Sequence, residues 1–118
     1  MSVANGLATA VRHYLLPVAH LAIKELYGEL TLDGTLTMTN QYRNLLRIDP
    51  TAARTVLLPP EEVGLWFVIA NAADAAETMT LKDDSNTNTI GTIAQNQAGV
   101  YWCDGTAWKR AITITAPA

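Results

Sequence analysis

The sequence predicts an all-β fold, a single antiparallel β-sandwich of jelly-roll type with about eight strands. Short segments in which apolar and polar residues alternate follow one another from residue 29 onward, separated by turn residues about every 8 to 12 positions. Asp-Gly pairs at 33–34 and 104–105 lie between such segments, which is typical of β-hairpins. The continuous apolar run 65–70 is typical of a buried central strand.

The composition favours a protein that contacts other proteins. The chain has 118 residues, enough for one domain with a real core. Only 16% of the residues are charged, against about a quarter in an average domain, and 49% are hydrophobic. A surface poor in charge tolerates close contact with another protein. The net charge is −3 and no basic run occurs, so nucleic acid is not an expected partner.

The cysteine count and the hydropathy pattern indicate where such a chain would be made. Cys103 is the single cysteine, so no internal disulfide and no zinc site built from cysteines is possible. One thiol fits assembly in a reducing cytoplasm. The sequence shows no signal peptide and no apolar stretch of about 18 residues, so we expect no membrane association.

Residues 1–28 differ from the rest and are assigned to an N-terminal arm, with the sandwich over 29–118. Apolar residues between 11 and 26 recur at helical spacing, but Pro17 precludes a continuous helix. The arm is either a short helix that begins near Pro17 or an extended segment. It either covers the open end of the core or docks on a partner. Its anchor residues would be Tyr14, Leu15, Leu16, Pro17, Val18, Leu21 and Ile23.

The strands follow in order after this arm. Leucine and methionine alternate with threonine on both sides of the 33–34 turn, and the X-Pro bond at 49–50 ends a third strand. Prolines at 59–60 end a fourth, and the polar run 83–88 is a solvated loop between two later strands. The expected strands lie at 29–32, 35–39, 42–48, 55–58, 65–70, 78–82 and 89–93, with a terminal hairpin over 99–112.

The terminal hairpin carries most of the aromatic surface. Trp102 and Trp108 flank its turn, and Trp66 lies in the apolar run 65–70. Such a hairpin needs other strands to cover one face. We interpret Trp66, Trp102 and Trp108 as aromatics of the core or of a subunit interface. A carbohydrate-stacking platform around Trp102 and Trp108 is the alternative.

Residues with catalytic or metal-binding potential are few. His13 and His20 have no third ligand nearby, and the adjacent carboxylates Glu61 and Glu62 point apart in a loop. Cys103 has no neighbouring cation to lower its pKa and is expected to be a small buried residue. The loop 83–88 lacks the glycine and the distal glutamate of a calcium loop. We therefore expect no enzyme, no metal and no cofactor.

Five segments together resemble a small β-sandwich module of tailed-bacteriophage virions. Similar chains show a strand ending in Leu-Pro, a buried strand that starts at glycine and ends at asparagine, and a terminal hairpin of the form aromatic-Asp-Gly-x-x-Trp. The resemblance covers about residues 30–112 and involves structural residues only. The segments are Arg-Thr-Val-Leu-Leu-Pro at 54–59, Gly-Leu-Trp-Phe-Val-Ile-Ala-Asn at 64–71, Thr-Met-Thr-Leu at 78–81, Thr-Ile-Gly-Thr-Ile at 89–93 and Val-Tyr-Trp-Cys-Asp-Gly-Thr-Ala-Trp-Lys at 100–109.

The resemblance implies a structural virion protein. The module occurs in head decoration (cement) proteins and in tail-fibre domains. A fibre domain normally belongs to a longer chain, so we expect a decoration protein on the capsid surface, assembled in the host cytoplasm. As a homo-oligomer (trimer or dimer), it would bind the major capsid protein through the arm and stabilise the mature head. The alternative is a tail-fibre or receptor-binding module that recognises host-surface glycan.

Overall fold

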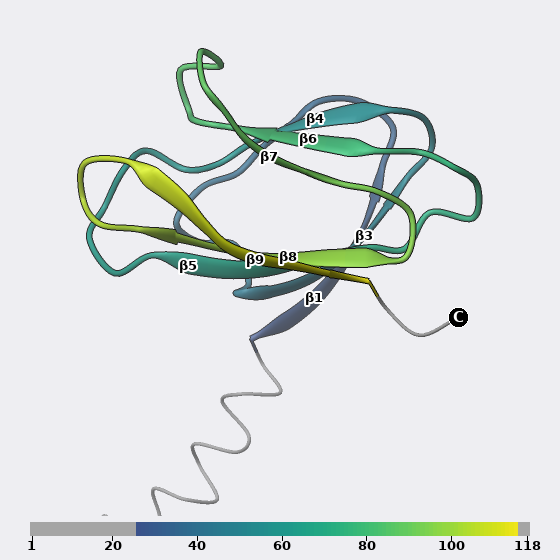
Figure 1. Cartoon of the computed structure of the whole chain (residues 1–118), viewed down its shortest axis with the longest axis horizontal. Helices are drawn as coiled ribbons and strands as arrows, with labels where there is room; N and C mark the ends of the chain where they lie inside the picture. The colour runs from purple at the N-terminus through teal and green to yellow at the C-terminus, as the bar shows by residue number, and fades with distance from the viewer. Residues whose placement is uncertain (1–25, 116–118) are drawn as a thin grey trace, which may run out of the picture.

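The computed structural model describes residues 26–115, which form nine strands and no helix (Figure 1). The all-β prediction is therefore confirmed for the described part of the chain. The strands are β1 (Tyr27–Leu32), β2 (Leu36–Thr37), β3 (Leu45–Pro50), β4 (Arg54–Leu57), β5 (Trp66–Asn71), β6 (Met79–Lys82), β7 (Thr89–Ile93), β8 (Gln97–Cys103) and β9 (Trp108–Thr115).

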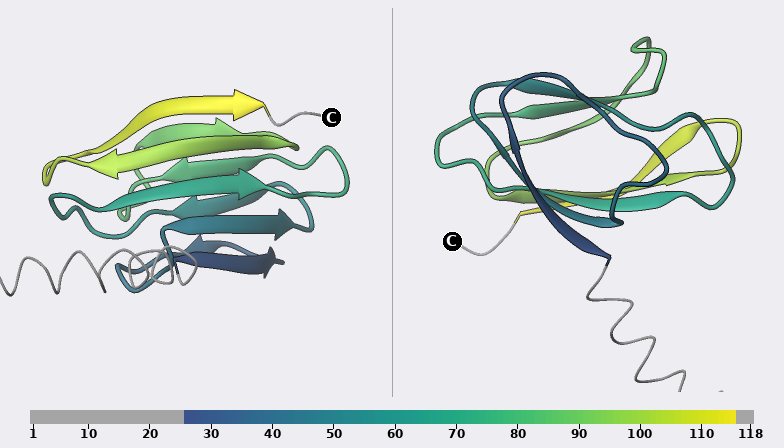
Figure 2. Two further views of the ribbon diagram at one scale, coloured as in Figure 1. Left: turned by 90° about the horizontal axis from the view of Figure 1, so that it is seen from below. Right: turned by 180° about the vertical axis from the view of Figure 1, so that it is seen from behind.

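The strands form two sheets that face each other. One sheet has five strands in the order β1-β3-β5-β8-β9, and the other has four in the order β2-β4-β6-β7. Figure 1 shows the sheets as two layers, and the left panel of Figure 2 shows the strands of the larger sheet side by side from below. The core lies between the two layers.

The first six strands alternate between the two sheets, and this makes their pairing parallel. β1 pairs with β3 and β3 with β5 in one sheet, while β2 pairs with β4 and β4 with β6 in the other. A chain that crosses to the opposite sheet after each strand returns to the first sheet running in the same direction. The predicted wholly antiparallel pairing is therefore wrong for this half of the chain, and the turn at 33–34 leads to the other sheet and makes no hairpin.

The last strands reverse this winding. β7 turns back beside β6, β8 runs antiparallel to β5, and β9 runs antiparallel to β8. The predicted terminal hairpin is confirmed, with Cys103 paired to Trp108 across a loop in which Gly105 has a φ of 96°. The sheets are thus mixed, with parallel strands on the side of β1 and β2 and antiparallel strands on the other side.

Inward-facing side chains of both sheets make up one core. The indole of Trp108 is buried, lies 5.9 Å from the ring of Phe67, and donates from Nε1 to the carbonyl oxygen of Pro59 at 2.8 Å. This bond ties the terminal hairpin to the loop after β4. The buried cluster consists of Leu32, Met38, Leu46, Ile48, Val56, Leu58, Phe67, Ile69, Met79, Leu81, Ile93, Tyr101, Cys103 and Trp108.

Strand β5 is central in its sheet, as predicted, but it is buried on one face only. Phe67 and Ile69 are buried, whereas Trp66 is exposed and Val68 and Ala70 are partly exposed. The apolar run at 65–70 is continuous because its outward-facing residues are apolar too. That outward face belongs to the surface considered next.

Candidate interaction surface

A row of five apolar residues crosses the outside of the five-stranded sheet, one from each strand. Tyr27 pairs with Leu45, Leu45 with Val68, Val68 with Val100, and Val100 with Ile112. All five are at least partly exposed, whereas their neighbours along the strands β5 and β8 are buried. We call this row the central row.

On β5 and β8, bulky side chains border one side of the central row and small ones border the other. Trp66 on β5 lies opposite Trp102 on β8, and the two side chains are 40% and 42% exposed. Four residues further along the same strands, Ala70 lies opposite Ala98. Together with Ile114, the partner of Ala98 on β9, these residues and the central row make up the outer apolar face.

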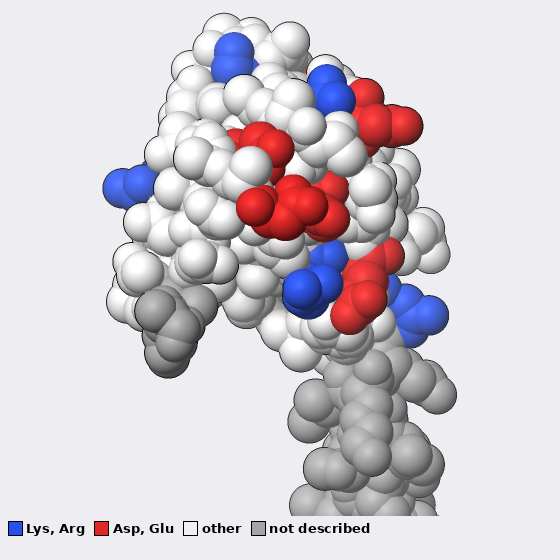
Figure 3. All heavy atoms as spheres, turned by 90° about the vertical axis from the view of Figure 1, so that its right-hand side faces the viewer, with Lys and Arg blue, Asp and Glu red and all other residues white. Residues whose placement is uncertain are grey.

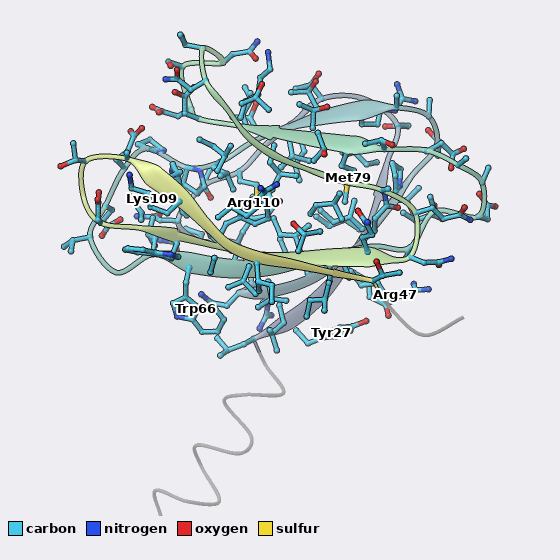
Figure 4. All side chains as sticks on the ribbon, viewed as in Figure 1. Tyr27, Arg47, Trp66, Met79, Lys109 and Arg110 are labelled. Atoms are coloured by element: carbon cyan, nitrogen blue, oxygen red, sulfur yellow. The ribbon has the colours of Figure 1, made fainter. Side chains whose placement is uncertain are left out.

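The outer apolar face points away from the other sheet. Figure 4 shows Trp66 and Tyr27 on the side of the five-stranded sheet that is remote from the four-stranded one. An open groove of about 450 Å³ lies on its alanine side. Figure 3 shows Lys and Arg as well as Asp and Glu side chains on the flank of the domain that lies on the right in Figure 1. The groove is lined by Tyr27, Leu45, Leu46, Arg47, Val68, Ala70, Asn71, Ala72, Asn96, Gln97 and Ala98.

Charged residues lie at the border of this face and on its alanine side, where Arg47 pairs with Ala70 and lines the groove. Glu29 pairs with Arg47 at the β1 edge, and Lys109 pairs with Trp102 near the β9 edge. The Tyr27 hydroxyl donates to Oε1 of Glu29 at 2.8 Å, and this hydrogen bond raises the pKa of Tyr27. An apolar centre with a polar border is the usual anatomy of a protein–protein interface.

The outside of the four-stranded sheet has a different character. Its central row consists of threonines, with Thr55 paired to Thr80 and Thr80 to Thr92. Hydroxyl groups on a sheet surface are readily solvated, so this face needs no partner. Five of the six large hydrophobic residues that are exposed in the described part of the chain lie on the outer apolar face, and the sixth, Val63, lies in the loop before β5.

The polar loop at 83–88 is held by its own hydrogen bonds. Oδ1 of Asp83 accepts from the Ser85 hydroxyl and from the backbone N–H groups of Thr87 and Asn88, and Oδ2 accepts from Nδ2 of Asn88. These bonds, led by the one from Thr87, lower the pKa of Asp83 to about 2. The carboxylate acts as the organising group of the β6–β7 loop.

Cys103 and Glu62 were the other residues considered as candidate reactive groups, and each makes a hydrogen bond within the domain. Cys103 is buried, as expected, and its Sγ accepts from the backbone N–H of Gly105 at 3.4 Å. Oε2 of Glu62 accepts from Nδ2 of Asn40 at 3.2 Å. Within residues 26–115, no group of three or more His, Cys, Asp or Glu side chains could hold a metal ion.

Several predicted site residues lie outside the described residues. These are His13 and His20 and the seven arm anchors Tyr14, Leu15, Leu16, Pro17, Val18, Leu21 and Ile23. β1 begins at Tyr27, so the last two residues assigned to the arm belong to a strand.

The three tryptophans separate into two environments. Trp108 is a core residue, as expected, whereas Trp66 and Trp102 lie on the surface and not in the core. The sequence interpretation missed the central row, because its five residues come from strands that are far apart along the chain. The one signal available was the unbroken apolar run at 65–70, in which both faces of a strand are apolar.

No protein-family model, curated protein or solved structure matches this chain. In the described part of the chain, no helix is both long and apolar enough to cross a membrane. The interpretation of the outer apolar face therefore depends on its own geometry.

Proposed function

We propose that this protein is a structural virion protein, a capsid decoration (cement) protein that binds the outer surface of the major capsid protein shell and stabilises the mature head. The observation that carries this proposal is the outer apolar face, which presents ten apolar side chains from five strands and suits a domain that assembles with copies of itself while the arm contacts the shell. Contiguous apolar patches of this kind mark interaction sites on soluble domains. The two facing sheets are consistent with the small β-sandwich module that the sequence resembles.

The mechanism is additive burial. A specific protein–protein contact buries about 800 Å² on each partner. A protein that binds the assembled shell, and not its separated subunits, lowers the free energy of the shell by mass action. Attachment through several copies raises avidity without new kinds of contact. The arm anchors around Leu15 and Leu16 would supply the contact with the shell, and the β-domain would lie on the outside.

The surroundings of the candidate reactive side chains favour this non-enzymatic proposal. The Asp83 carboxylate is occupied by its own loop, and Cys103 is buried in the core. Both groups therefore contribute to the fold of the domain.

A binding assay with shells tests the proposal. The full chain is mixed with phage heads that lack it, and bound protein is quantified after sedimentation. We expect saturation at a copy number close to that of the major capsid protein, and shells that withstand higher temperature. The double variant Leu15→Asp, Leu16→Asp should lose binding, while Thr80→Glu on the threonine face serves as the matched control. Binding of only a few copies per particle would contradict the proposal.

A tail-fibre or receptor-binding module that recognises host-surface glycan is the second candidate. Trp108 is buried, so Trp102 and Trp108 cannot together form the carbohydrate-stacking platform that was the alternative from the sequence. The exposed pair of Trp66 and Trp102 favours this candidate instead, because sugar rings stack on exposed indoles. Titration with host glycans should then shift the indole resonances of Trp66 and Trp102. Indole resonances that do not shift, together with a glycan array on which no glycan binds the protein, would eliminate this second candidate function.

A further inference from the structure

We propose that the outer apolar face is the docking surface for a second copy of this chain, arranged face to face about a two-fold axis that runs along the central row. Trp66 would then lie against Ala70 of the partner subunit, and Trp102 against Ala98 of the partner subunit. This inference deepens the proposed function, from which it takes the homo-oligomeric state, and it names the surface that forms the oligomer.

The order of side-chain sizes along β5 and β8 carries the argument. On β5 the outward residues run from Trp66 through Val68 to Ala70. On β8, which runs in the opposite direction, Trp102, Val100 and Ala98 lie opposite them in the same order. Both central strands therefore carry a large residue at one end of the face, a valine in the middle and a small residue at the other end.

A two-fold axis turns this gradient into a self-complementary surface. An isologous contact places a patch against itself, so every protrusion must meet a hollow of the same patch. Rotation by half a turn about the central row exchanges the two ends of β5 and of β8. The tryptophan pair of each copy then meets the alanine pair of the other, where the groove of about 450 Å³ provides space.

The alternative in-plane axis fits poorly. An axis parallel to the strands would keep the ends of β5 and β8 in place and would bring tryptophans against tryptophans. The alanine ends would then face each other across an unfilled space, which forfeits the packing that stabilises an interface. The size gradient therefore selects the axis along the central row.

The charges at the border favour a second copy over a charged partner. Glu29 and Arg47 lie side by side at one corner, and Lys109 lies at another. Charges of both signs at the border give no field that would select an acidic or a basic macromolecule. The apolar centre carries no charge, so the centre of one copy can pack against the same centre of a second copy.

The size of the face predicts how tightly the copies associate. Five strands about 4.8 Å apart and five residues of about 3.3 Å each give a footprint of roughly 24 by 17 Å, or about 400 Å² per copy. This footprint is smaller than the standard contact of about 800 Å² per partner. We therefore expect a reversible dimer, which would be strengthened when many copies occupy one shell.

Sedimentation equilibrium of the full chain tests the association. We expect the wild-type protein to change from monomer to dimer as its concentration rises. Val68→Glu would place two carboxylates face to face on the axis and should weaken the dimer at least about tenfold. Thr80→Glu, at the corresponding central position of the other sheet, should leave the dimer unchanged. Trp102→Lys provides a second variant at an exposed position if Val68→Glu does not fold.

Isotope-filtered NOE spectroscopy tests the geometry. In a mixture of labelled and unlabelled copies, we expect contacts between the Trp66 indole and the Ala70 methyl group of the partner subunit. Residues four apart in one strand are separated by about 13 Å, which is too far for a contact within a copy. A protein that stays monomeric at all concentrations, a dimer without these contacts, or a dimer unaffected by Val68→Glu would overturn the inference.

The shell-binding assay separates this inference from the proposed function. A monomeric protein that still saturates shells would overturn the docking surface and leave the decoration role intact. A dimer with the expected contacts that does not bind shells would overturn the decoration role and support the docking surface.

Discussion

Trp66 and Trp102 lie directly opposite each other on the outside of the five-stranded sheet, each with about two fifths of its side chain exposed. Residues opposite each other in an antiparallel pair have Cβ atoms about 5 Å apart, so the two indoles leave the sheet side by side on the same face. The third tryptophan, Trp108, is buried in the core. The aromatic residues of this chain therefore serve two purposes, one in the fold and one on the surface.

The hydrogen bond from Trp108 to Pro59 is expected to stabilise the fold. Trp108→Phe keeps a ring in the core but leaves the carbonyl oxygen of Pro59 without its partner. We expect the free energy of unfolding, measured by urea denaturation, to fall by about 1–3 kcal/mol. Trp102→Phe, on the surface, should change it by less than about 0.5 kcal/mol at a protein concentration at which the chain is monomeric. Equal losses in the two variants would contradict the assignment.

The buried amide of Asn71 connects the end of β5 to the four-stranded sheet. Its Nδ2 donates to the carbonyl oxygens of Glu77 and Ile93, and its Oδ1 accepts from the backbone N–H of Ala73. Asn71→Asp replaces the donor with an acceptor, so we expect a loss of about 2–5 kcal/mol in the free energy of unfolding.

A partly exposed asparagine provides the control for that substitution. Nδ2 of Asn44 donates a single bond to the carbonyl oxygen of Trp66 at 2.7 Å. Asn44→Asp should cost clearly less than Asn71→Asp in the same thermal or urea denaturation experiment. If the two variants are equally stable, the three side-chain hydrogen bonds of Asn71 do not stabilise the fold.

The Asp83 carboxylate predicts a specific dependence of stability on pH. Its pKa is about 2 in the folded protein, below the ordinary value of 3.8, so the ionised form stabilises the fold. This contribution is complete above about pH 4 and is lost as the pH falls from 3.8 toward 2. The difference in urea midpoint between wild type and Asp83→Asn should therefore be largest above this window and should shrink within it.

The neighbouring carboxylate is the natural control for this pH effect. Asp84 lies in the same loop and is exposed. Asp84→Asn should leave the urea midpoint close to that of wild type over the same pH series. A gap between wild type and Asp83→Asn that stays constant down to pH 2 would refute the role of Asp83.

The ring of Tyr101 occupies the space above Gly99. A Cβ atom at Gly99 would lie 2.6 Å from Cε2 and 2.8 Å from the hydroxyl oxygen of Tyr101, so the buried ring would have to shift. We expect Gly99→Ala to reduce the free energy of unfolding by about 1–3 kcal/mol. Gly34→Ala, where nothing lies within 4 Å, should be neutral or slightly stabilising in the same denaturation assay. Similar stabilities of the two variants would show that the ring has room to move.

Local sequence signals predicted most strands, but not how they pair. The Asp-Gly pair at 104–105 forms the expected turn, in which Gly105 has a positive φ and Oδ1 of Asp104 accepts from the N–H groups of Thr106 and Ala107. Gly34 follows an aspartate in the same way but does not have a positive φ. Pairing of β1 with β3 overrides the local preference there, and no dipeptide signal encodes that choice.

The outer apolar face could not be predicted without the register of the strands in the sheet. Alternation along each strand predicts which residues share a face, but the row that joins Tyr27 to Ile112 exists only once every strand is aligned with its neighbours. Trp66 and Trp102 were expected at the core or at an interface, and only the β5–β8 register places them side by side on the surface.

The tryptophan emission spectrum of the full chain over a dilution series tests most directly whether the outer apolar face is a contact surface. The chain has three tryptophans, of which Trp66 and Trp102 lie on this face and Trp108 is buried. We expect the emission of the wild-type protein to move to longer wavelength on dilution, as the two surface indoles become solvated, and that of Val68→Glu to stay at the longer wavelength throughout. A wild-type spectrum that stays constant over the range in which sedimentation shows dimer converting to monomer would contradict a contact at this face.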